Sequence, residues 1–420
     1  MNHIISSTLL DIEEAPLNLI LVGNGILDIN SGELVPFSPD YFFVNAIPTK
    51  YVKGTISQLW LKFISEVMDP QDVLVAQEYV GFMLYRYYLF ERLLMLTGSG
   101  ANGKSVFLST ITEMLGRKNI TSISMVEIET SSFSRSNLYG KLANIFDDLP
   151  ATALKTTGYL KQVTGRSLIS AERKFHDMFN FINYAKLVFA CNAVPKCPDD
   201  TDAFFRRWLQ INFPKVFLEN DPKTDKDLTA KLTKPEELSG ILNWAIEGLL
   251  RLLKNKRFSA GKSIEETREQ YIRSTDPVQA FGMDMIISSP GNLIKKDDVY
   301  RLFITYCKQH KLPTVSSRTF SSSQQDAMTD ITIQTEYKFE NKTRTPYWRD
   351  IAISSINNEI DNTDNSDNSH IPVAELKNKI NSEKTILQNK KKGSDKLSEL
   401  SDLSAFMQDN GQDEAKNEGS

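Results

Sequence analysis

Cysteine and histidine are scarce in this chain of 420 residues, which contains three cysteines and four histidines. Cys191, Cys197 and Cys307 are too few and too scattered to form a disulfide framework or a zinc cluster. We therefore expect plain buried thiols in a reducing compartment.

Long apolar runs and a strong charge of either sign are also missing. No stretch reaches the ~18 apolar residues that a membrane span needs, and the N-terminus lacks a basic start followed by an apolar run. These absences predict a cytoplasmic, intracellular protein with no membrane contact. A net charge of −4 gives no attraction of the whole chain to nucleic acid, so contact with DNA would depend on local basic groups. Hydrophobic residues at 40% and charged residues at 24% fit an ordinary globular protein.

The stretch LLMLTGSGANGKSVFL at residues 93–108 matches two nucleotide-binding patterns. Gly98, Gly100 and Gly103 satisfy the G-x-G-x-x-G of dinucleotide-binding folds. Residues 98–105 satisfy the G-x-x-x-x-G-K-S of the phosphate loop of NTPases. The two patterns imply different ligands, so the residues around the glycines must decide between them.

Lys104 and Ser105 favour the phosphate loop. An ammonium that reaches the β- and γ-phosphates and a hydroxyl that binds Mg²⁺ are needed for triphosphate chemistry. The dinucleotide alternative needs an acid about 20 residues further on, and Glu127 lies near that place. The phosphate-loop interpretation predicts an ATP cradle made of Gly98, Ser99, Gly100, Ala101, Asn102, Gly103, Lys104 and Ser105.

Polar side chains follow two other apolar runs. The run at 142–146 ends in Asp147 and Asp148, where one carboxylate could organise Mg²⁺ with Ser105 and the other could act as a base toward water. The run at 185–190 is followed by Asn192, whose carboxamide could orient the attacking water. The alternatives are a solvated turn for the aspartates and a simple turn cap for the asparagine.

Two arginines, Arg206 and Arg207, lead into a further apolar run at 208–213. An arginine can stabilise the charge on a transferred phosphoryl group, and presentation by a neighbouring subunit would link turnover to a ring. A structural ion pair is the alternative for each. With residues 93–96 these runs give four buried strands separated by helical segments, which predicts an α/β fold with a parallel sheet.

The flanking segments have patterns of their own. Residues 18–49 mix short apolar runs with turn formers, and residues 55–89 have helical spacing broken at Asp69-Pro70. One apolar face in residues 238–255 predicts a helix that closes the domain. From Lys295 onward we expect a helix, a second helix and a hairpin, which is a winged-helix outline.

We therefore divide the chain into four parts. They are a small α+β lead-in region at 1–88, a P-loop ATPase domain at 89–258, a winged-helix domain at 264–353 and a polar tail at 354–420 that we expect to be disordered. Basic side chains that the winged helix could offer to duplex DNA are Arg318, Lys338, Lys342, Arg344 and Arg349, although such folds also bind proteins.

A second hairpin is expected between the Asp pair and Asn192. The segments LISAERKF and FNFINYA can pair, which places Arg173, Lys174, Phe175 and His176 near the tip. Two cations, an imidazole and an aromatic ring at a projecting tip suit the phosphates and bases of single-stranded DNA. An ordinary solvated hairpin is the alternative.

The ordered set GSGANGKS, NIFDDLP, LKQVTGRSLISAERKFHDMFNF, LVFACNAVP and DAFFRRWLQINFP resembles the superfamily 3 helicase domain of the phage and plasmid primase–helicase family, which is related to viral initiator helicases. The resemblance covers about residues 18–353. It implies an AAA+-like core, ATP and Mg²⁺ as cofactors, and a homo-hexameric ring whose hairpins line a DNA channel. It also implies translocation from 3′ to 5′.

Two departures from the family stand out. Members commonly have TGGD where this chain has Thr164-Gly165-Arg166-Ser167, so an acidic side chain is missing from that loop. No primase-type domain or metal-ligand cluster precedes the lead-in region, and we expect no primase activity.

The expected function is thus an ATP-dependent DNA helicase that forms a ring and serves the replication of a virus, plasmid or integrated element in its host cell. A DNA-binding replication initiator or loader, whose ATPase only switches assembly, is the main alternative. A small-molecule kinase is a third, and it would need an acceptor pocket and a closing lid.

Overall fold

The computed structural model describes residues 14–150, 154–217, 224–259, 262–310, 312, 314–327, 334–340 and 343–354. All of them belong to the first of two compact units, Met1–Ser355. The tail expected at 354–420 lies outside the described residues from position 355 onward. No helix in the described ranges is both long enough and apolar enough to cross a bilayer.

The N-terminal part contains three short strands followed by two helices. The strands form an antiparallel sheet, as the turn-rich pattern predicts, and consist of β1 (Leu19–Val22), β2 (Gly25–Asp28) and β3 (Glu33–Val35). The helices are α2 (Gln58–Val67) and α3 (Pro70–Met83). Ser57 caps α2 by accepting a hydrogen bond from the amide of Trp60 at 3.0 Å. Pro70 is the first residue of α3, where a backbone N–H would have no acceptor within the helix, so proline loses no hydrogen bond there.

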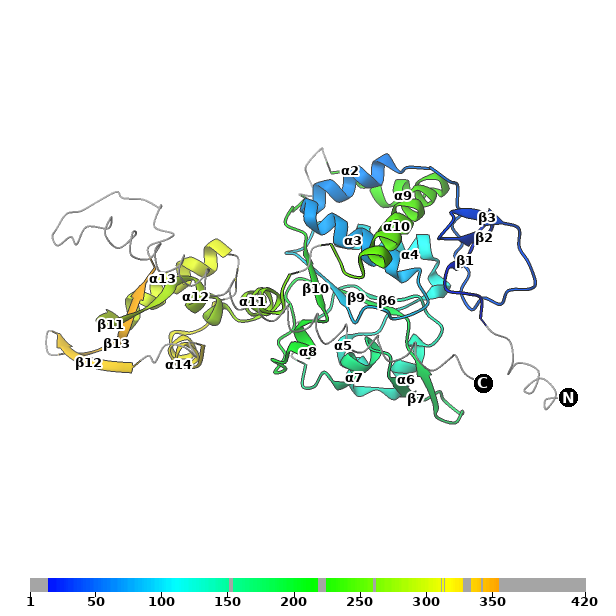
Figure 1. The fold of residues 1–420 in the computed structure, drawn as a ribbon. Coiled ribbons are helices and arrows are strands. Elements are labelled where there is room, and N and C mark those ends of the chain that lie inside the picture. The colour runs from blue at the N-terminus through cyan, green and yellow to red at the C-terminus, as the bar shows by residue number, and fades with distance from the viewer. Residues whose placement is uncertain are drawn as a thin grey trace, which may run out of the picture. The chain divides into compact units, whose positions relative to one another are not determined.

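The core of the molecule is a five-stranded parallel sheet in the order β10-β4-β9-β6-β5 (Figure 1). Its strands are β4 (Leu93–Thr97), β5 (Ile120–Thr121), β6 (Ala143–Phe146), β9 (Lys186–Cys191) and β10 (Trp208–Asn212). The four apolar runs predicted as strands are all present, and the parallel α/β class is confirmed. The two-residue strand β5 was not expected, because its pattern is too short to recognise.

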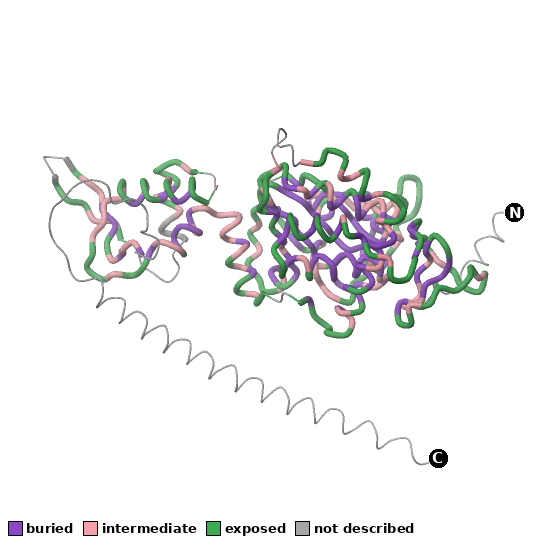
Figure 2. The backbone as a smooth tube through the Cα atoms, turned by 90° about the horizontal axis from the view of Figure 1, so that it is seen from above, coloured by how far each residue is buried: buried purple, intermediate pink, exposed green. Residues whose placement is uncertain are grey.

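Helices cover both faces of this sheet. One face carries α2, α3 and α4 (Lys104–Leu115) together with α9 (Leu228–Leu232) and α10 (Pro235–Asn255). The other carries α5 (Met125–Thr130), α6 (Ser132–Arg135), α7 (Gly158–Val163) and α8 (Asp202–Phe205). Alternate residues of β4 enter separate clusters: Leu94 and Leu96 pack on the first face, and Leu93 and Met95 on the second. Figure 2 shows buried residues concentrated around the sheet.

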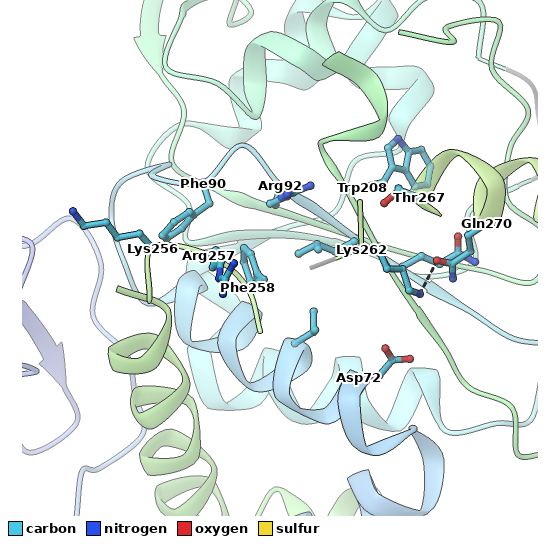
Figure 3. Close-up of a pocket in the computed structure, with 13 residues that line it drawn as sticks. Asp72, Phe90, Arg92, Trp208, Lys256, Arg257, Phe258, Lys262, Thr267 and Gln270 are labelled. Carbon is cyan, nitrogen blue, oxygen red and sulfur yellow. Dashed lines mark hydrogen bonds between the residues drawn. The ribbon is translucent and has the colours of Figure 1, made fainter. Parts of the chain in front are cut away.

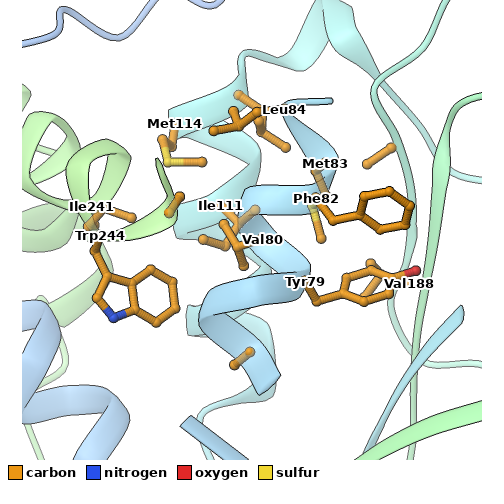
Figure 4. Packing of buried hydrophobic residues seen from close by; sticks show 14 of the residues in the cluster. Tyr79, Val80, Phe82, Met83, Leu84, Ile111, Met114, Val188, Ile241 and Trp244 are labelled. Carbon is orange, nitrogen blue, oxygen red and sulfur yellow. The ribbon is translucent and has the colours of Figure 1, made fainter. Parts of the chain in front are cut away.

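Helices α3 and α10 pack closely against each other. Figure 4 shows side chains of α3 beside Ile111 and Met114 of α4 and Trp244 of α10. A Cβ atom at Gly81 would collide with the carbonyl of Ala245, so only glycine permits this approach. Although the sequence was divided at residue 88, α2 and α3 therefore share one hydrophobic cluster with the sheet.

A hairpin and a C-terminal module complete the fold. The hairpin strands β7 (Leu168–Ala171) and β8 (Phe179–Ile182) pair antiparallel, as predicted. After α11 (Ile264–Thr275) the module contains α12 (Pro277–Met285), β11 (Ile286–Lys295), α13 (Lys296–His310), α14 (Ser317–Ala327), β12 (Gln334–Glu340) and β13 (Thr343–Ile353).

The C-terminal module has a hydrophobic cluster of its own around Phe281, Phe303, Phe320 and Trp348. Its sheet is antiparallel in the order β11-β13-β12. The two helices and the hairpin agree with expectation, although residues 331–333 and Lys342 lie outside the described residues. Strand β11 was missed because Pro290 and Gly291 interrupt its apolar pattern, and its pairing with β13 shifts register there.

Candidate nucleotide-binding site

The glycine-rich loop connects the carboxyl end of β4 to the start of α4. Gly103 has a φ of 92° and directly precedes the helix. A Cβ atom there would also lie 3.1 Å from the side chain of Val67 in α2, so both backbone and packing favour glycine. The first amides of α4 have no partners within the helix and face the loop, which is the arrangement that binds phosphate.

Lys104 lies inside this loop and is 6% exposed. Its Nζ donates hydrogen bonds to the carbonyl of Gly98 at 2.8 Å, to Oδ1 of Asn102 at 3.2 Å and to Oδ1 of Asn192 at 3.2 Å. Burial lowers the pKa of the ammonium, opposed by Cys191 and by the two aspartates of the site. All three of these acceptors are neutral, so the positive charge of Lys104 is available to an anion.

Ser105 contacts the predicted acid directly. Its hydroxyl donates to Oδ2 of Asp147 at 2.7 Å, although Ser105 lies in α4 and Asp147 directly follows β6. The amide of Asp148 donates to Oδ1 of Asp147 at 2.9 Å. The backbone of Asp148 has a φ of 60°, so the chain turns sharply after β6. A hydroxyl and a carboxylate in contact are the ligand types that hold Mg²⁺ together with phosphate oxygens.

Sheet order explains why these residues meet. Strand β9 lies between β4 and β6, so the ends that carry the loop, Asn192 and Asp147 are neighbours. In parallel sheets ligands bind at this carboxyl edge, where the strand order reverses. No group of three or more His, Cys, Asp or Glu side chains in the described part of the chain could hold a metal ion by itself. A Mg²⁺ ion here would thus need oxygens from the nucleotide or water.

The site opens into a cavity of about 860 Å³. The predicted cradle lines this cavity from Gly100 to Ser105, whereas Ser99 is exposed outside it. Both aspartates and Asn192 line it as well. Cys191 also borders it, but burial raises the pKa of its thiol to about 12, so it remains a neutral core residue as expected.

The opposite wall was not anticipated from the sequence. It is formed by α2 and by the segment after β10, and its side chains include Leu59, Phe63, Phe217, Asp225 and Leu228. The amide of Phe217 donates to the carbonyl of Ala101 at 2.7 Å, which fixes this segment against the phosphate loop. These residues come from distant parts of the sequence, and no spacing rule connects them.

Glu127, the acid on which the dinucleotide alternative depends, has a different role. Its carboxylate accepts hydrogen bonds from the amide and the hydroxyl of Ser124, each at 2.8 Å. This is a capping box at the start of α5. Glu127 therefore stabilises a helix terminus and does not line the cavity.

The two arginines do not reach this cavity within the same chain. Each places a guanidinium nitrogen 2.9 Å from the same oxygen of Glu91. Arg207 has an 8% exposed side chain and also donates to the hydroxyl of Thr164 at 3.0 Å, which matches the ion-pair alternative. Arg206 is 51% exposed and is held less tightly.

The hairpin tip has the exposed character that was expected. Phe175 is fully exposed and has a φ of 64°. The Arg173 guanidinium lies over the ring of Phe179, 5.0 Å from its centre. Lys174 and His176 make no ion pair or side-chain hydrogen bond with any other described residue. All four predicted tip residues thus lie together on the turn between β7 and β8.

Comparison with known proteins gives two partial family matches. Residues 96–207 match a family of unknown function (DUF5906). Residues 3–69 match the family described as D5 N terminal like. Each covers less than half of the chain.

A curated relative from Acanthamoeba polyphaga mimivirus, named "Putative helicase", is 32% identical over 225 residues. The alignment covers 50% of this chain and 23% of that protein, so this chain spans about a quarter of the viral protein's length.

Solved structures of the C-terminal region of NrS-1 align more weakly. One apo form has a TM-score of 0.38 at 13% identity and covers 67% of this chain and 64% of that chain. Another has a TM-score of 0.37 at 12% identity, with 72% and 76% covered. Likeness at this level defines neither the fold nor the activity. Over part of its length this chain is thus similar to a D5-like N-terminal family and to a viral protein named as a putative helicase.

Proposed function

We propose that this protein is an ATP-dependent DNA helicase of the superfamily 3 type, which forms a homo-hexameric ring during replication of a virus, plasmid or integrated element. One observation carries the proposal: Lys104, the Ser105–Asp147 pair and Asn192 converge on the cavity at the carboxyl edge of the sheet. The similarity to a viral protein named as a putative helicase supports the choice of a nucleic acid as the substrate.

Each side chain of this cluster has a place in ATP hydrolysis. Lys104 exchanges its contacts with neutral oxygens for the β- and γ-phosphates, and Asn192 is then free to orient water. Ser105 and Asp147 would hold Mg²⁺, which would neutralise phosphate charge when bound. Asp148, whose side chain is exposed at the cavity, accepts the proton of the attacking water.

The remaining wall of the cavity suits the nucleoside. Phe63, Phe217 and Leu228 present apolar surface to a base, and the carboxylate of Asp225 is placed at the same wall for ribose hydroxyls. Since this wall offers few directional groups, we expect modest discrimination among the four nucleoside triphosphates.

Arg206 is our candidate for action on the nucleotide of an adjacent protomer. Its side chain is half exposed and held by a single carboxylate, so it can turn toward a neighbour. Arg207 is buried between Glu91 and Thr164, and these contacts hold the residues that precede β10 in position. This division gives turnover a dependence on ring assembly.

DNA contacts are assigned to the hairpin and to the C-terminal module. The tip with Arg173, Lys174, Phe175 and His176 provides charge and a ring for single-stranded DNA. The order of helices and strands supports a winged helix for the C-terminal module, and Arg318 on α14 is a candidate contact for duplex DNA.

Size analysis with and without ATP and single-stranded DNA, combined with a forked-duplex unwinding assay, tests the proposal. We expect ATP-dependent assembly and strand separation, with Lys104→Ala losing both. ATP turnover that ignores DNA, in a protein that stays a monomer, would refute the proposal. Turnover with assembly but without unwinding would instead favour the initiator or loader.

The hairpin provides a sharper distinction between motor and loader. Replacing Lys174 and His176 by Ala should abolish strand separation and leave DNA-independent ATP hydrolysis intact, because neither side chain approaches the nucleotide cavity. Unchanged unwinding in that double variant would contradict the motor assignment.

A further inference from the structure

A second cavity lies away from the phosphate loop, with a volume of about 240 Å³ (Figure 3). It is bounded by α3, by the amino half of β10, by the residues after α10 and by α11. Phe90 and Arg92 place it at the amino end of β4, whereas the phosphate loop leaves the carboxyl end. A five-residue strand separates the two by about 16 Å, so one nucleotide cannot fill both.

Cations dominate the lining of this cavity. Arg92, Arg257 and Lys262 border it, and none of them makes an ion pair with a described residue. The ammonium of Lys262 donates only to the neutral Oε1 of Gln270, at 2.7 Å. Arg257 makes no hydrogen bond to any residue that the structure describes. Arg257 and Lys262 are at exposed positions, so an anion that entered the cavity would meet cations that no described acid already pairs with.

Arg92 is the most enclosed of the three. Burial lowers the pKa of its guanidinium, and the charge of the neighbouring Arg206 lowers it further. Its guanidinium donates one hydrogen bond within the described part of the chain, to the carbonyl of Arg206, which leaves its other N–H groups for a ligand. Asp72 is the single acid of the cavity, and Lys262 acts on it electrostatically without forming an ion pair. Positive charge therefore remains in excess.

We propose that this cavity is a second anion site, which binds a phosphate group through Arg92, Arg257 and Lys262. Its volume lies below the roughly 300–1,000 Å³ of pockets for whole small molecules, so a phosphate with little of its ester is the fitting ligand. Guanidinium groups bind phosphate through paired N–H donors, and two of the three cations are arginines. The phosphate can be free or part of a DNA backbone.

The test uses inorganic phosphate as the probe, measured by calorimetry on the full chain. Lys104→Ala forms the background, because it removes the main cation of the phosphate loop. We expect one phosphate per chain in that background. Arg257→Gln and Lys262→Gln, both at exposed positions, should each weaken binding roughly tenfold, the loss expected for one charged hydrogen bond.

Lys256→Gln is the matched control. Lys256 borders the cavity, but its side chain extends away from the other cations in Figure 3, so phosphate affinity should stay unchanged. Asp72→Asn should tighten phosphate binding, because it removes the opposing carboxylate; its folding is checked by thermal unfolding. Absence of phosphate binding in the Lys104→Ala background, or unchanged affinity in both Arg257→Gln and Lys262→Gln, overturns the proposal.

A single-stranded oligonucleotide without terminal phosphates separates the two sources. Displacement of inorganic phosphate by this oligonucleotide, lost in Arg257→Gln, identifies a DNA backbone site. Retention of inorganic phosphate in the presence of bound oligonucleotide identifies a site for free phosphate. The proposal does not depend on helicase activity, since every readout is an affinity measured without ATP.

Discussion

Glu91 separates the roles of two adjacent arginines. Both contact one of its carboxylate oxygens at 2.9 Å, but the side chain of Arg207 is 8% exposed and that of Arg206 is 51% exposed. Removing one partner of a buried ion pair leaves an uncompensated charge, whereas an exposed pair contributes little. Arg206 and Arg207 are adjacent in the sequence, but we expect them to contribute different amounts to the free energy of unfolding.

We predict that Arg207→Ala lowers the free energy of unfolding by about 3 kcal/mol. Arg206→Ala should change it by less than about 1 kcal/mol, yet reduce ATP turnover of the assembled protein by roughly a thousandfold. Urea denaturation and steady-state ATPase assays on both variants test this contrast. Equal effects of the two substitutions on turnover would remove the distinction drawn here.

Asp199 is a carboxylate whose ionised form stabilises the fold. Its partial burial acts to raise its pKa, but hydrogen bonds from Lys161, Thr157 and Thr201 outweigh this and hold the pKa well below the ordinary value of 3.8. The salt bridge to Lys161 measures 2.8 Å. The stabilisation is therefore complete above the ordinary pKa and is lost as the pH falls toward the lowered one.

We predict that Asp199→Asn is less stable than the parent by about 2 kcal/mol at neutral pH. The difference should shrink as the pH falls below about 4, because the unfolded parent then takes up a proton at Asp199 while the folded parent keeps this carboxylate ionised. Urea denaturation near neutral pH and again at about pH 3 measures it. A difference independent of pH would show that the hydrogen bonds do not depend on ionisation.

Among the elements, the β7–β8 hairpin keeps an unfavourable residue at its tip. Phe175 has a φ of 64°, which a bulky side chain adopts at a cost of about 1–3 kcal/mol. Its ring is fully exposed and stabilises nothing within the described part of the chain. A strained, exposed aromatic residue on a turn suits contact with a ligand.

Phe175→Gly should therefore raise the thermal stability of the protein slightly, by at most about 1 kcal/mol. The same change should weaken binding of single-stranded DNA by about 1–3 kcal/mol, the usual worth of one base–aromatic stack. Thermal unfolding and fluorescence anisotropy with a labelled oligonucleotide separate the two effects. Loss of stability together with unchanged DNA affinity would assign the ring to the fold instead.

At the scale of single elements, the sequence predicted the strands and the site residues that a local pattern of residues marks. The core strands are buried on both faces and appear as apolar runs, and Asp147 and Asn192 were found because polar residues directly follow such runs. Glu127 was ambiguous, because a capping box and a ribose-binding acid look alike in isolation. Phe217 was missed, because its place in the cavity arises from tertiary packing.

For the molecule as a whole, separate hydrophobic clusters predict separate unfolding. The two clusters around the parallel sheet share its strands, whereas the cluster of the C-terminal module contains residues from position 278 onward. Phe303 is completely buried in that third cluster and stacks on Phe320 with ring centres 4.5 Å apart.

Phe303→Ala should destabilise the C-terminal module by about 3–5 kcal/mol. Binding of a fluorescent ATP analogue should persist, because no residue of this module lines the nucleotide cavity. Chemical denaturation followed by circular dichroism should show an early transition in this variant that the nucleotide signal does not follow. One coincident transition for both probes would indicate a single cooperative unit.

The glycine contact between α3 and α10 has a practical consequence for anyone dividing this chain. At Gly81 and Gly248 the two helices approach so closely that an added Cβ atom would collide with the backbone of the other helix. A fragment that began just before the phosphate loop would keep the nucleotide-binding motifs and still expose Trp244 and its neighbours to water. Such a fragment would be recovered as an aggregate, and its lack of activity would say nothing about the chemistry of the motifs it carries.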